Sequence, residues 1–410
     1  MSWESIPISD LGQVVTGKTP PTANREFYDG NYPFITPTDL DWQSYVVRET
    51  HSTVTELARD RNRNQFIPAG ATVFTCIGNT IGKCGISAED SLTNQQINSV
   101  VPNDEHDPKF VYYLLNHYRP QIRSIGLGNG AAQPIINKTT FSGVSVQVPP
   151  TLGDEQRIAA ILSAYDELIE NNRRRIGLLE DAARQLYKEW FVRFRFPGHE
   201  HVKVVDGLPV GWERVLFSEM ADVLRGRSYT SAELRDEGGR AFVNLKCINR
   251  FGGFRDTGVK GIEGDFREKH MVSPGDIVMA VTDMTRDAMI VAQSGRISKT
   301  VEADAIFSMD LVKIVPKPEI QQDWLYSLLR FSSFAFDVRE HANGTNVLHL
   351  KPKHIEEWKG VLPSERVRDW FMGLVQPVFD QIDNLQLQSR NAAKARDLLL
   401  PRLMNGSLTV

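Results

Sequence analysis

Two long stretches with helical spacing of apolar residues set the main constraint on how this chain folds. The first, 154–191, has no proline and a single glycine, and its apolar residues recur every three or four positions. At about 1.5 Å per residue, a helix over this stretch extends roughly 57 Å. A rod of that length cannot bury its stripe against one small domain, so it needs a second rod. The stretch 364–405 repeats the spacing and supplies one.

The seam of the first rod is predicted from its apolar spacing, with polar Asn172 standing where another apolar residue is expected. The predicted seam residues are Ile158, Ile161, Tyr165, Leu168, Ile176, Leu179, Ala183, Leu186 and Trp190. In the second rod, Ile382–Leu385 (IDNL) matches Ile169–Asn172 (IENN), about half a chain earlier. The rods are therefore part of an internal repeat.

Further matches occur in the same order through both halves of the chain. They pair Trp3-Glu4 with Trp212-Glu213, Gly17-Lys18 with Gly226-Arg227, IPAGATVF at Ile67 with VSPGDIVM at Val272, and FVYYLL at Phe110 with WLYSLL at Trp324. A shared order of weak matches indicates a tandem duplication. We predict a globular unit at 1–150, a rod at 151–195, a second globular unit at 196–363 and a second rod at 364–410.

Each globular unit is predicted to be a mixed α/β (α+β) domain. Apolar strands are expected at Ala71–Ile77 and Asp276–Val281, before or after Gly- and Pro-containing turns. Short helices are expected at Phe110–His117 and Trp324–Phe331. A strand is expected at Phe141–Val148, ended by the two prolines that precede the first rod.

Composition excludes several classes of protein. Of the residues, 41% are hydrophobic and 24% charged, and the net charge is −4, which argues against indiscriminate binding to nucleic acid. No apolar run reaches the roughly 18 residues of a membrane helix, and the N-terminus lacks the pattern of a signal peptide. Three cysteines, Cys76, Cys84 and Cys247, have no metal-ligand spacing. We therefore expect a cytoplasmic protein without membrane contact.

Catalytic motifs are sparse. The segment Gly78–Cys84 (GNTIGKC) resembles a phosphate-binding loop, but it is one residue short between the glycines and ends in cysteine instead of serine or threonine. His199 and His201 lie in a loop-rich linker, where solvated histidines are the usual interpretation. We predict no catalytic residue, cofactor site or metal site in this chain.

Recognition of another molecule remains, and two similar units on a rod scaffold suit a ligand with two separated sites. Duplex DNA is such a ligand because spacing along it is rigid. Basic, amide and hydroxyl side chains beside glycines and turns are the candidates for phosphate or base contacts. They are Lys18, Arg61, Arg63, Asn79, Asn129, Arg227, Lys246, Arg267, Lys269, Asn343 and Thr345. Taken singly, each is also explained as a solvated charge or a turn residue.

Four motifs at the junctions resemble one known family. They are PPTLGDEQRIAAIL at 149–162, YKEWFVRFRFPGHE at 187–200, GLPVGWE at 207–213 and LLLPRLMNGSL at 398–408. In these the chain is similar to the specificity subunits of type I restriction–modification systems, over essentially its whole length. The second copy departs from the Glu155-Gln156-x-Ile158 signature, with Glu365-Arg366-Val367 in its place.

The resemblance implies that each globular unit is a target recognition domain that reads one half of a split DNA sequence. It implies that the rods pack as an antiparallel coiled-coil pair with pseudo-two-fold symmetry, and that rod length sets the gap between half-sites. Two adenine N6-methyltransferase subunits, which use S-adenosylmethionine, are the implied partners. ATP-driven restriction subunits, with ATP and Mg²⁺, are possible further partners.

Two alternatives stay open from the sequence. One is a fused recognition and cleavage or methylation enzyme, which would need a catalytic domain beyond the two repeats. The other is a non-catalytic scaffold that binds proteins at each end. A methyltransferase reading frame beside this gene would favour the restriction–modification interpretation.

Overall fold

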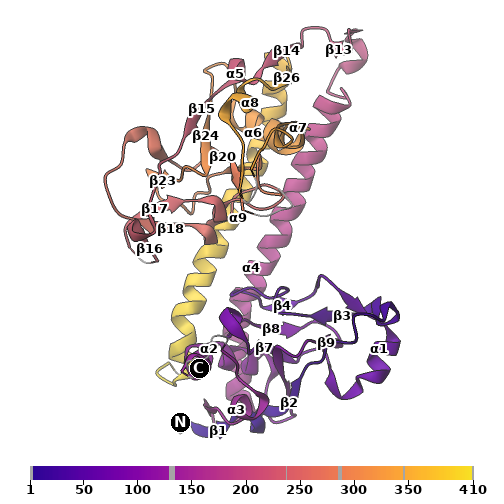
Figure 1. Ribbon diagram of the computed structural model, residues 1–410, viewed down its shortest axis with the longest axis vertical. Helices are drawn as coiled ribbons and strands as arrows, with labels where there is room; N and C mark the ends of the chain where they lie inside the picture. Colours follow the sequence, from indigo (N-terminus) through magenta and orange to yellow (C-terminus); the bar gives the residue numbers. More distant parts are fainter. Residues whose placement is uncertain (1–2, 129–133, 237, 285–288, 345–346, 409–410) are drawn as a thin grey trace. The chain divides into compact units, whose positions relative to one another are not determined.

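A computed structural model describes residues 3–128, 134–236, 238–284, 289–344 and 347–408. The chain forms two compact units, one made of residues 1–169 and 391–410 and the other of residues 170–390. Each unit combines a sheet-rich domain with part of two long helices (Figure 1). The mixed α/β fold with long helices is confirmed.

The two predicted rods are helices α4 (Leu152–Tyr187) and α9 (Glu365–Met404). A π-helical turn, Lys188–Val192, continues α4. The predicted bounds 154–191 and 364–405 are therefore correct to within a few residues. The proline at 377 does not interrupt α9, which runs continuously through it.

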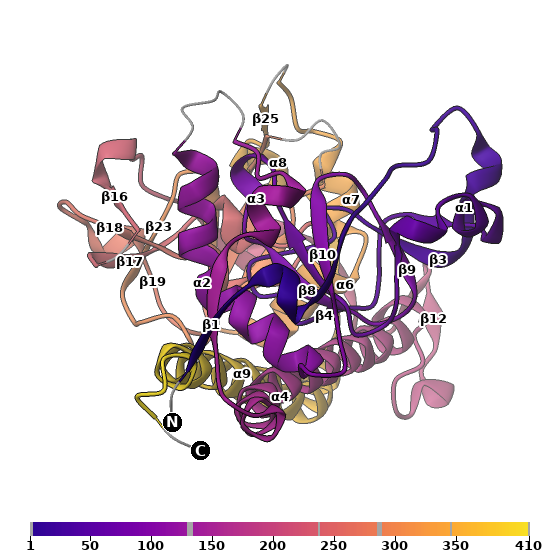
Figure 2. The same cartoon turned by 90° about the horizontal axis from the view of Figure 1, so that it is seen from below.

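The sheet-rich domain of the first unit contains three sheets, whose orders are β2-β10-β7-β8-β4, β5-β3-β9-β6 and β1-β11. The strands are β1 (Glu4–Pro7), β2 (Gly12–Thr16), β3 (Tyr28–Ile35), β4 (Val46–Val47), β5 (Thr53–Val54), β6 (Phe66–Ile67), β7 (Thr72–Thr75), β8 (Cys84–Ser87), β9 (Ser91–Thr93), β10 (Ile97–Pro102) and β11 (Ser145–Val148). The helices are α1 (Glu56–Arg61), α2 (Pro108–Leu127) and α3 (Lys138–Ser142). Helix α2 packs on the sheet that contains β7, β8 and β10 (Figure 2).

The second unit repeats this topology, with sheet orders β15-β24-β20-β22, β16-β18-β17-β23-β19 and β14-β26. Its main strands are β14 (Glu213–Leu216), β15 (Ala221–Arg225), β16 (Leu234–Arg235), β17 (Arg240–Val243), β18 (Lys260–Ile262), β19 (Met271–Val272), β20 (Ile277–Ala280), β22 (Ser294–Arg296), β23 (Ala305–Phe307), β24 (Leu311–Pro316) and β26 (Lys359–Leu362). Two short pairs are added, β12 (Val204–Val205) with β13 (Leu208–Pro209), and β21 (Thr282–Asp283) with β25 (Leu348–His349). The helices are α5 (Phe217–Met220), α6 (Gln322–Phe331), α7 (Phe334–Arg339) and α8 (Pro352–Glu356).

The duplication predicted from sequence is thus visible in the sheets. Strands β2, β10, β7 and β8 of the first unit correspond in order to β15, β24, β20 and β22 of the second. Likewise β3 and β9 pair in parallel, as do β17 and β23. In both units the helix that follows, α2 or α6, packs on the sheet that contains β8 or its counterpart β22.

Within each unit, the portions of α4 and α9 that belong to it run antiparallel. In the first unit, Ile158 near the start of α4 shares a core with Leu403 near the end of α9. In the second unit, the rings of Tyr187 and Trp190 at the end of α4 lie 6.2 and 5.9 Å from the ring of Phe371, near the start of α9. Buried aromatic side chains contribute much of the free energy that holds two packed helices together.

Two local predictions differ from the structure. Helix α2 extends to Leu127 instead of ending near His117, because Ile122 and Gly126 continue its buried face. Phe141 lies in helix α3 and not in a strand, since the side chain of Asn137 caps that helix by accepting from the Thr140 N–H at 2.8 Å. The strand that follows begins at Ser145.

The buried stripe of α4 is also rotated from the predicted seam. Leu168 is 43% exposed, whereas Leu162, Asp166 and Ile169 are buried. Asn172 is fully buried, as its position in the repeat indicated, and neither its Oδ1 nor its Nδ2 has a hydrogen-bond partner within the described residues. A buried amide without partners costs free energy of folding.

Replacing Asn172 by leucine should therefore stabilise the protein by about 1–2 kcal/mol, because the unpaired amide is removed. The repeat supports the choice, since the corresponding residue of α9, Leu385, is fully buried. Differential scanning calorimetry should show a higher Tm for Asn172→Leu and almost no change for Asn171→Leu, whose side chain is exposed. A lower Tm for Asn172→Leu would mean that the amide is paired in solution.

Candidate nucleic-acid interface

The glycine of the predicted Gly17-Lys18 pair has a structural role. The Gly17 N–H donates to the Ile97 carbonyl at 3.2 Å, and the Lys18 N–H donates to the Thr93 carbonyl at 2.8 Å. A Cβ at Gly17 would collide with the backbone and side chain of Thr93. The glycine thus lets this segment approach β9, and it leaves the Lys18 side chain exposed.

The second copy repeats the same backbone contacts. The Gly226 N–H donates to the Leu311 carbonyl at 3.4 Å, and the Arg227 N–H donates to the Phe307 carbonyl at 2.9 Å. A Cβ at Gly226 would collide with the Ser308 carbonyl. The sequence repeat at these pairs is therefore accounted for by chain packing.

The side chain of Arg227 is placed differently from that of Lys18. It forms an ion pair with Glu233 at 2.6 Å, with the two side chains only 18% and 27% exposed, and its guanidinium lies 5.1 Å from the centre of the Phe266 ring. The hydrogen bond from Arg227 lowers the pKa of Glu233. A phosphate would have to replace Glu233 to reach Arg227, whereas it can reach Lys18 directly.

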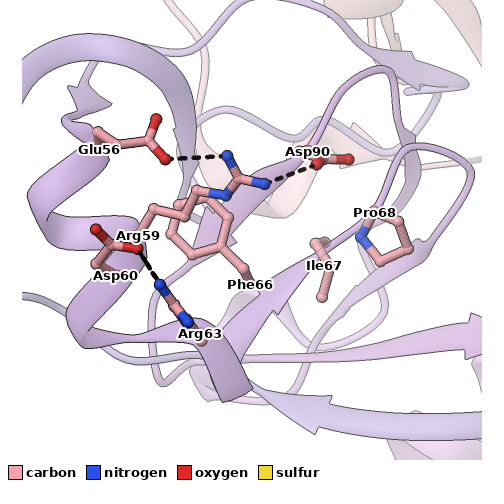
Figure 3. Close-up of a pocket in the computed structure, with 8 residues that line it drawn as sticks. All are labelled: Glu56, Arg59, Asp60, Arg63, Phe66, Ile67, Pro68 and Asp90. Atoms are coloured by element: carbon pink, nitrogen blue, oxygen red, sulfur yellow. Dashed lines mark hydrogen bonds and ion pairs between the residues drawn. The ribbon is translucent and has the colours of Figure 1, made fainter.

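The basic segment that contains Arg61 and Arg63 borders a pocket of about 420 Å³ (Figure 3). Its arginines alternate with carboxylates: Arg59 pairs with Glu56 at 3.1 Å and approaches Asp90 at 3.9 Å, while Arg63 pairs with Asp60 at 2.8 Å (Figure 3). The other lining residues are Phe66, Ile67 and Pro68. Two arginines and three carboxylates leave this pocket without an excess of positive charge.

Arg61 lies outside that pocket and is exposed. Its guanidinium stacks 5.3 Å from the centre of the Phe27 ring, and no carboxylate partner is found for it among the described residues. Of the two arginines predicted here, Arg61 is therefore the one whose charge is not already neutralised by a neighbour.

The loop that resembles a phosphate-binding motif is committed to internal contacts. The Lys83 ammonium donates to the carbonyls of Leu40 at 2.6 Å and Pro37 at 3.0 Å. Asn79 lies in a single 3-10 turn, Gly78–Thr80, with its side chain exposed. A turn of three residues provides no helix whose N-terminus could hold a phosphate, but Asn79 is accessible to a ligand.

In the second unit, Lys246, Arg267 and Lys269 are all exposed. The Lys246 carbonyl accepts from Arg255 Nη2 at 2.7 Å, which fixes the backbone and leaves the ammonium free to move. Lys269 borders a second pocket, of about 380 Å³, which also contains the ion pair of Lys313 with Asp276.

Asn343 is exposed, and its side-chain amide donates to the His341 carbonyl at 3.0 Å. The other two predicted residues of this kind, Asn129 and Thr345, lie outside the described residues. The predicted residues thus fall in both units, and the exposed ones are separated along several loops.

Sequence reasoning missed the contacts that hold the sheet-rich domains on the helices. The carboxylate of Glu155, in the Glu-Gln signature, accepts from the Asp107 N–H at 2.8 Å and contacts His106 Nδ1 at 2.7 Å. This hydrogen bond raises the pKa of His106. At the corresponding place in α9, Arg368 donates to the Glu319 carbonyl at 2.9 Å. In the repeat that pairs Ile169 with Ile382, Arg368 stands at the position of Glu155, so the second copy has a guanidinium where the first has a carboxylate.

The described residues also bear on other chemistry. Cys76, Cys84 and Cys247 are buried, and burial raises the pKa of each thiol to about 12, so they remain protonated. Within the described ranges, no three histidine, cysteine or acidic side chains are grouped as a metal site would need. No helix in the part of the chain that the structure describes is long and apolar enough to cross a membrane.

Comparison with known proteins agrees with this architecture. Residues 1–181 match the model of the type I restriction modification DNA specificity domain. The MjaIX specificity subunit of Methanocaldococcus jannaschii is 27% identical over 423 residues, covering 100% of this chain and 94% of that protein. The HindI specificity subunit of Haemophilus influenzae is 34% identical over 149 residues, covering 36% of this chain and 32% of that protein. A crystal structure of the S subunit from M. genitalium shares the fold, with a TM-score of 0.58, 14% identity and coverage of 98% and 96%.

Residues 1–181 are therefore assigned to a DNA specificity domain, which is a recognition module. Over its full length the chain is similar to a specificity subunit of a type I restriction–modification system, and its first 181 residues match the DNA specificity domain of that family. The resemblance inferred from the junction motifs is confirmed, and so is the inference that this chain is not itself an enzyme.

Proposed function

We propose that the chain reads a DNA target in two parts separated by a fixed gap, with one half-site for each sheet-rich domain. The observation that supports this most strongly is the repeated topology: strands β2, β10, β7 and β8 recur in order as β15, β24, β20 and β22, and each domain is anchored to a long helix, the first to α4 and the second to α9. Two similar recognition domains joined by continuous helices suit two half-sites held at a defined distance along a rigid duplex.

The partners in this proposal are two adenine N6-methyltransferase subunits, joined in some assemblies by ATP-driven restriction subunits. S-adenosylmethionine, ATP and Mg²⁺ then belong to those subunits and not to this chain. The HindI relative and the MjaIX relative are named as subunits of type I restriction enzymes, which supports this assignment.

Changing the gap tests the two-part target directly. The assembled complex should bind a duplex with the natural gap at least tenfold more tightly than duplexes with one base pair added or removed, because each extra pair rotates and displaces one half-site. Fluorescence anisotropy with labelled duplexes measures this. Equal affinity for all gaps would contradict a fixed spacing between half-sites.

Replacing both Arg61 and Arg63 by alanine should reduce DNA affinity and its dependence on salt. Each lost phosphate contact should lower the slope of log K against log salt by about 0.9. Since Arg63 is paired with Asp60 and Arg61 has no carboxylate partner within the described residues, Arg61→Ala alone should account for most of the change. Lys203→Ala, an exposed change in the linker, serves as the control. An unchanged slope in the double variant would remove this segment from the DNA site.

A further inference from the structure

An exposed tryptophan stands on the loop between β3 and β4 of the first unit. Trp42 is 42% exposed, and two arginines of helix α2 lie against its ring, with Arg119 at 5.7 Å and Arg123 at 5.2 Å from the ring centre. Arg119 Nη1 also donates to the Trp42 carbonyl at 3.3 Å. The arginine therefore fixes the backbone of the loop while the indole stays accessible.

The second unit has an exposed aromatic residue at the corresponding loop. Phe251 follows β17, is 74% exposed, and its carbonyl accepts a hydrogen bond from Arg330 Nη1 of helix α6. This loop returns to the edge strand through the Gly253 N–H, which donates to the Ser294 carbonyl at 2.8 Å. In the first unit the loop contacts β8, the counterpart of β22, where the Ile86 N–H donates to the Tyr45 carbonyl at 2.8 Å.

In both units a glycine makes room for the arginine. Gly82 has φ +102°, and a Cβ there would lie 2.7 Å from Arg119 Cγ. Gly252 has φ +78°, and a Cβ there would collide with the guanidinium of Arg330. The two arginines lie about one turn apart in the aligned helices, so the same arrangement is built with different residues. The arrangement is thus retained in both copies, although an exposed ring adds little to folding stability.

Other exposed aromatic residues do not recur in this way. Trp370 is 41% exposed and Phe336 is 60% exposed, and each also lies near an arginine. In the repeat, Trp370 corresponds to Arg157 and Phe336 to the buried Ile122. A feature shared by both copies points to what both copies bind.

The surroundings of the two rings are mainly cationic. Arg123 has no carboxylate partner within the described residues, and neither does Arg250, which is exposed beside Phe251. Lys246 and Arg255 extend the positive charge in the second unit. In the first unit the carboxylates near the loop are Asp39 and Asp41, against the cations Arg119, Arg123 and Lys83. In the second unit they are Asp256 and Glu180. The balance is positive in both loops, although the whole chain has a net charge of −4.

We propose that Trp42 and Phe251 are the aromatic contacts through which the two domains hold duplex DNA, one ring for each half-site. Cations next to an exposed ring suit a polyanion whose bases or sugars offer flat apolar surfaces. The ring packs against a sugar or enters a base step, and Arg123 or Arg250 meets the neighbouring phosphate. Arg119 and Arg330 are positioning residues that hold the loop backbone. This inference rests on the proposed two-part recognition of DNA.

The test compares matched alanine variants of the full chain, each in complex with the modification subunits. The probes are a duplex with the motif that is methylated in the source cells, and a duplex of the same length with that motif scrambled. Trp42→Ala and Phe251→Ala should each raise the Kd for the motif duplex about tenfold to hundredfold, as loss of one stacking contact does. Trp370→Ala and Phe336→Ala, the matched controls, should change it less than twofold.

Further readouts separate stacking from charge. Phe251→Trp should retain affinity within about threefold because any flat ring suffices. Arg250→Ala should lower the salt slope by about 0.9, whereas Phe251→Ala should leave the slope unchanged. Wild-type affinity in both Trp42→Ala and Phe251→Ala would overturn the proposal. So would loss of the modification subunits from these complexes with unchanged DNA affinity in the complexes that remain, because that outcome means the rings bind protein. If even the wild-type complex does not distinguish the two duplexes, the proposed function itself fails.

Discussion

Replacing Arg396 by methionine should destabilise the first unit by about 3–5 kcal/mol, the usual cost of leaving a buried charge without its partner. Arg396 of α9 pairs with Asp166 of α4, and their side chains are only 11% and 2% exposed. Tyr113 of α2 donates to the other oxygen of Asp166 at 2.5 Å. Three helices therefore meet at one carboxylate, and loss of the arginine leaves it buried without its cationic partner.

The penalty should depend on pH. Burial already raises the pKa of Asp166, and Arg396 opposes this effect. Without Arg396 the folded protein binds the Asp166 proton more tightly than the unfolded chain, so stability falls as pH rises above about 4. Urea titrations at pH 5 and pH 8 should show a smaller loss at pH 5.

A second substitution provides the control. Asp166→Asn with Arg396→Met should recover most of the stability, because the amide is neutral and its oxygen still accepts from Tyr113. Arg390→Met, an exposed change on the same helix, should have an effect near zero. A loss in Arg396→Met as small as in Arg390→Met would contradict the role of this ion pair.

A loss of similar size, about 3–5 kcal/mol, is expected for Arg296→Met in the second unit. Arg296 of β22 contacts Asp323 of α6 at 2.8 Å and Asp383 of α9 at 2.7 Å. Both carboxylates are less than a tenth exposed, and burial raises the pKa of Asp323. Removing the arginine leaves two carboxylates near each other, with Lys299 at 3.7 Å from Asp383 as the remaining cation.

Hydrogen–deuterium exchange measures this effect and locates it. Exchange should accelerate in β22, α6 and the 365–390 part of α9 in Arg296→Met, and it should stay unchanged in the matched variant Arg214→Met, whose side chain is exposed on β14. If exchange in Arg296→Met accelerates equally in all segments, or no more than in Arg214→Met, Arg296 does not hold the domain on the helix.

These ion pairs mark the limit of what the sequence predicts. Periodicity located both long helices, and the ordered repeats predicted two domains of one topology, because apolar spacing and turn residues are local signals. The buried face of α4 differs from the predicted apolar seam because the core includes Asp166, whereas Leu168 is exposed. A carboxylate at a core position is recognisable only when its partner, 230 residues away, is known.

The candidate site shows the same limit. The Gly-Lys and Gly-Arg pairs are recognisable in the sequence as part of the repeat, whereas the close backbone approach that requires their glycines is visible only in the structure. The sequence presents Lys18 and Arg227 as equivalent residues of the repeat. Only the structure shows that the Arg227 side chain forms an ion pair with Glu233. The sequence does not reveal that Trp42 and Phe251 correspond, because the two residue types differ. The arginines that bind their carbonyls lie far away in the sequence, in helices α2 and α6.

Sequencing the methylation of the source genome, with this gene intact and deleted, tests the central claim most directly. If the chain selects the DNA target, deletion removes N6-methyladenine from one two-part motif with a fixed gap, and supplying the gene again restores it. Methylation of such a motif that persists in full after deletion would contradict the assignment of target recognition to this chain.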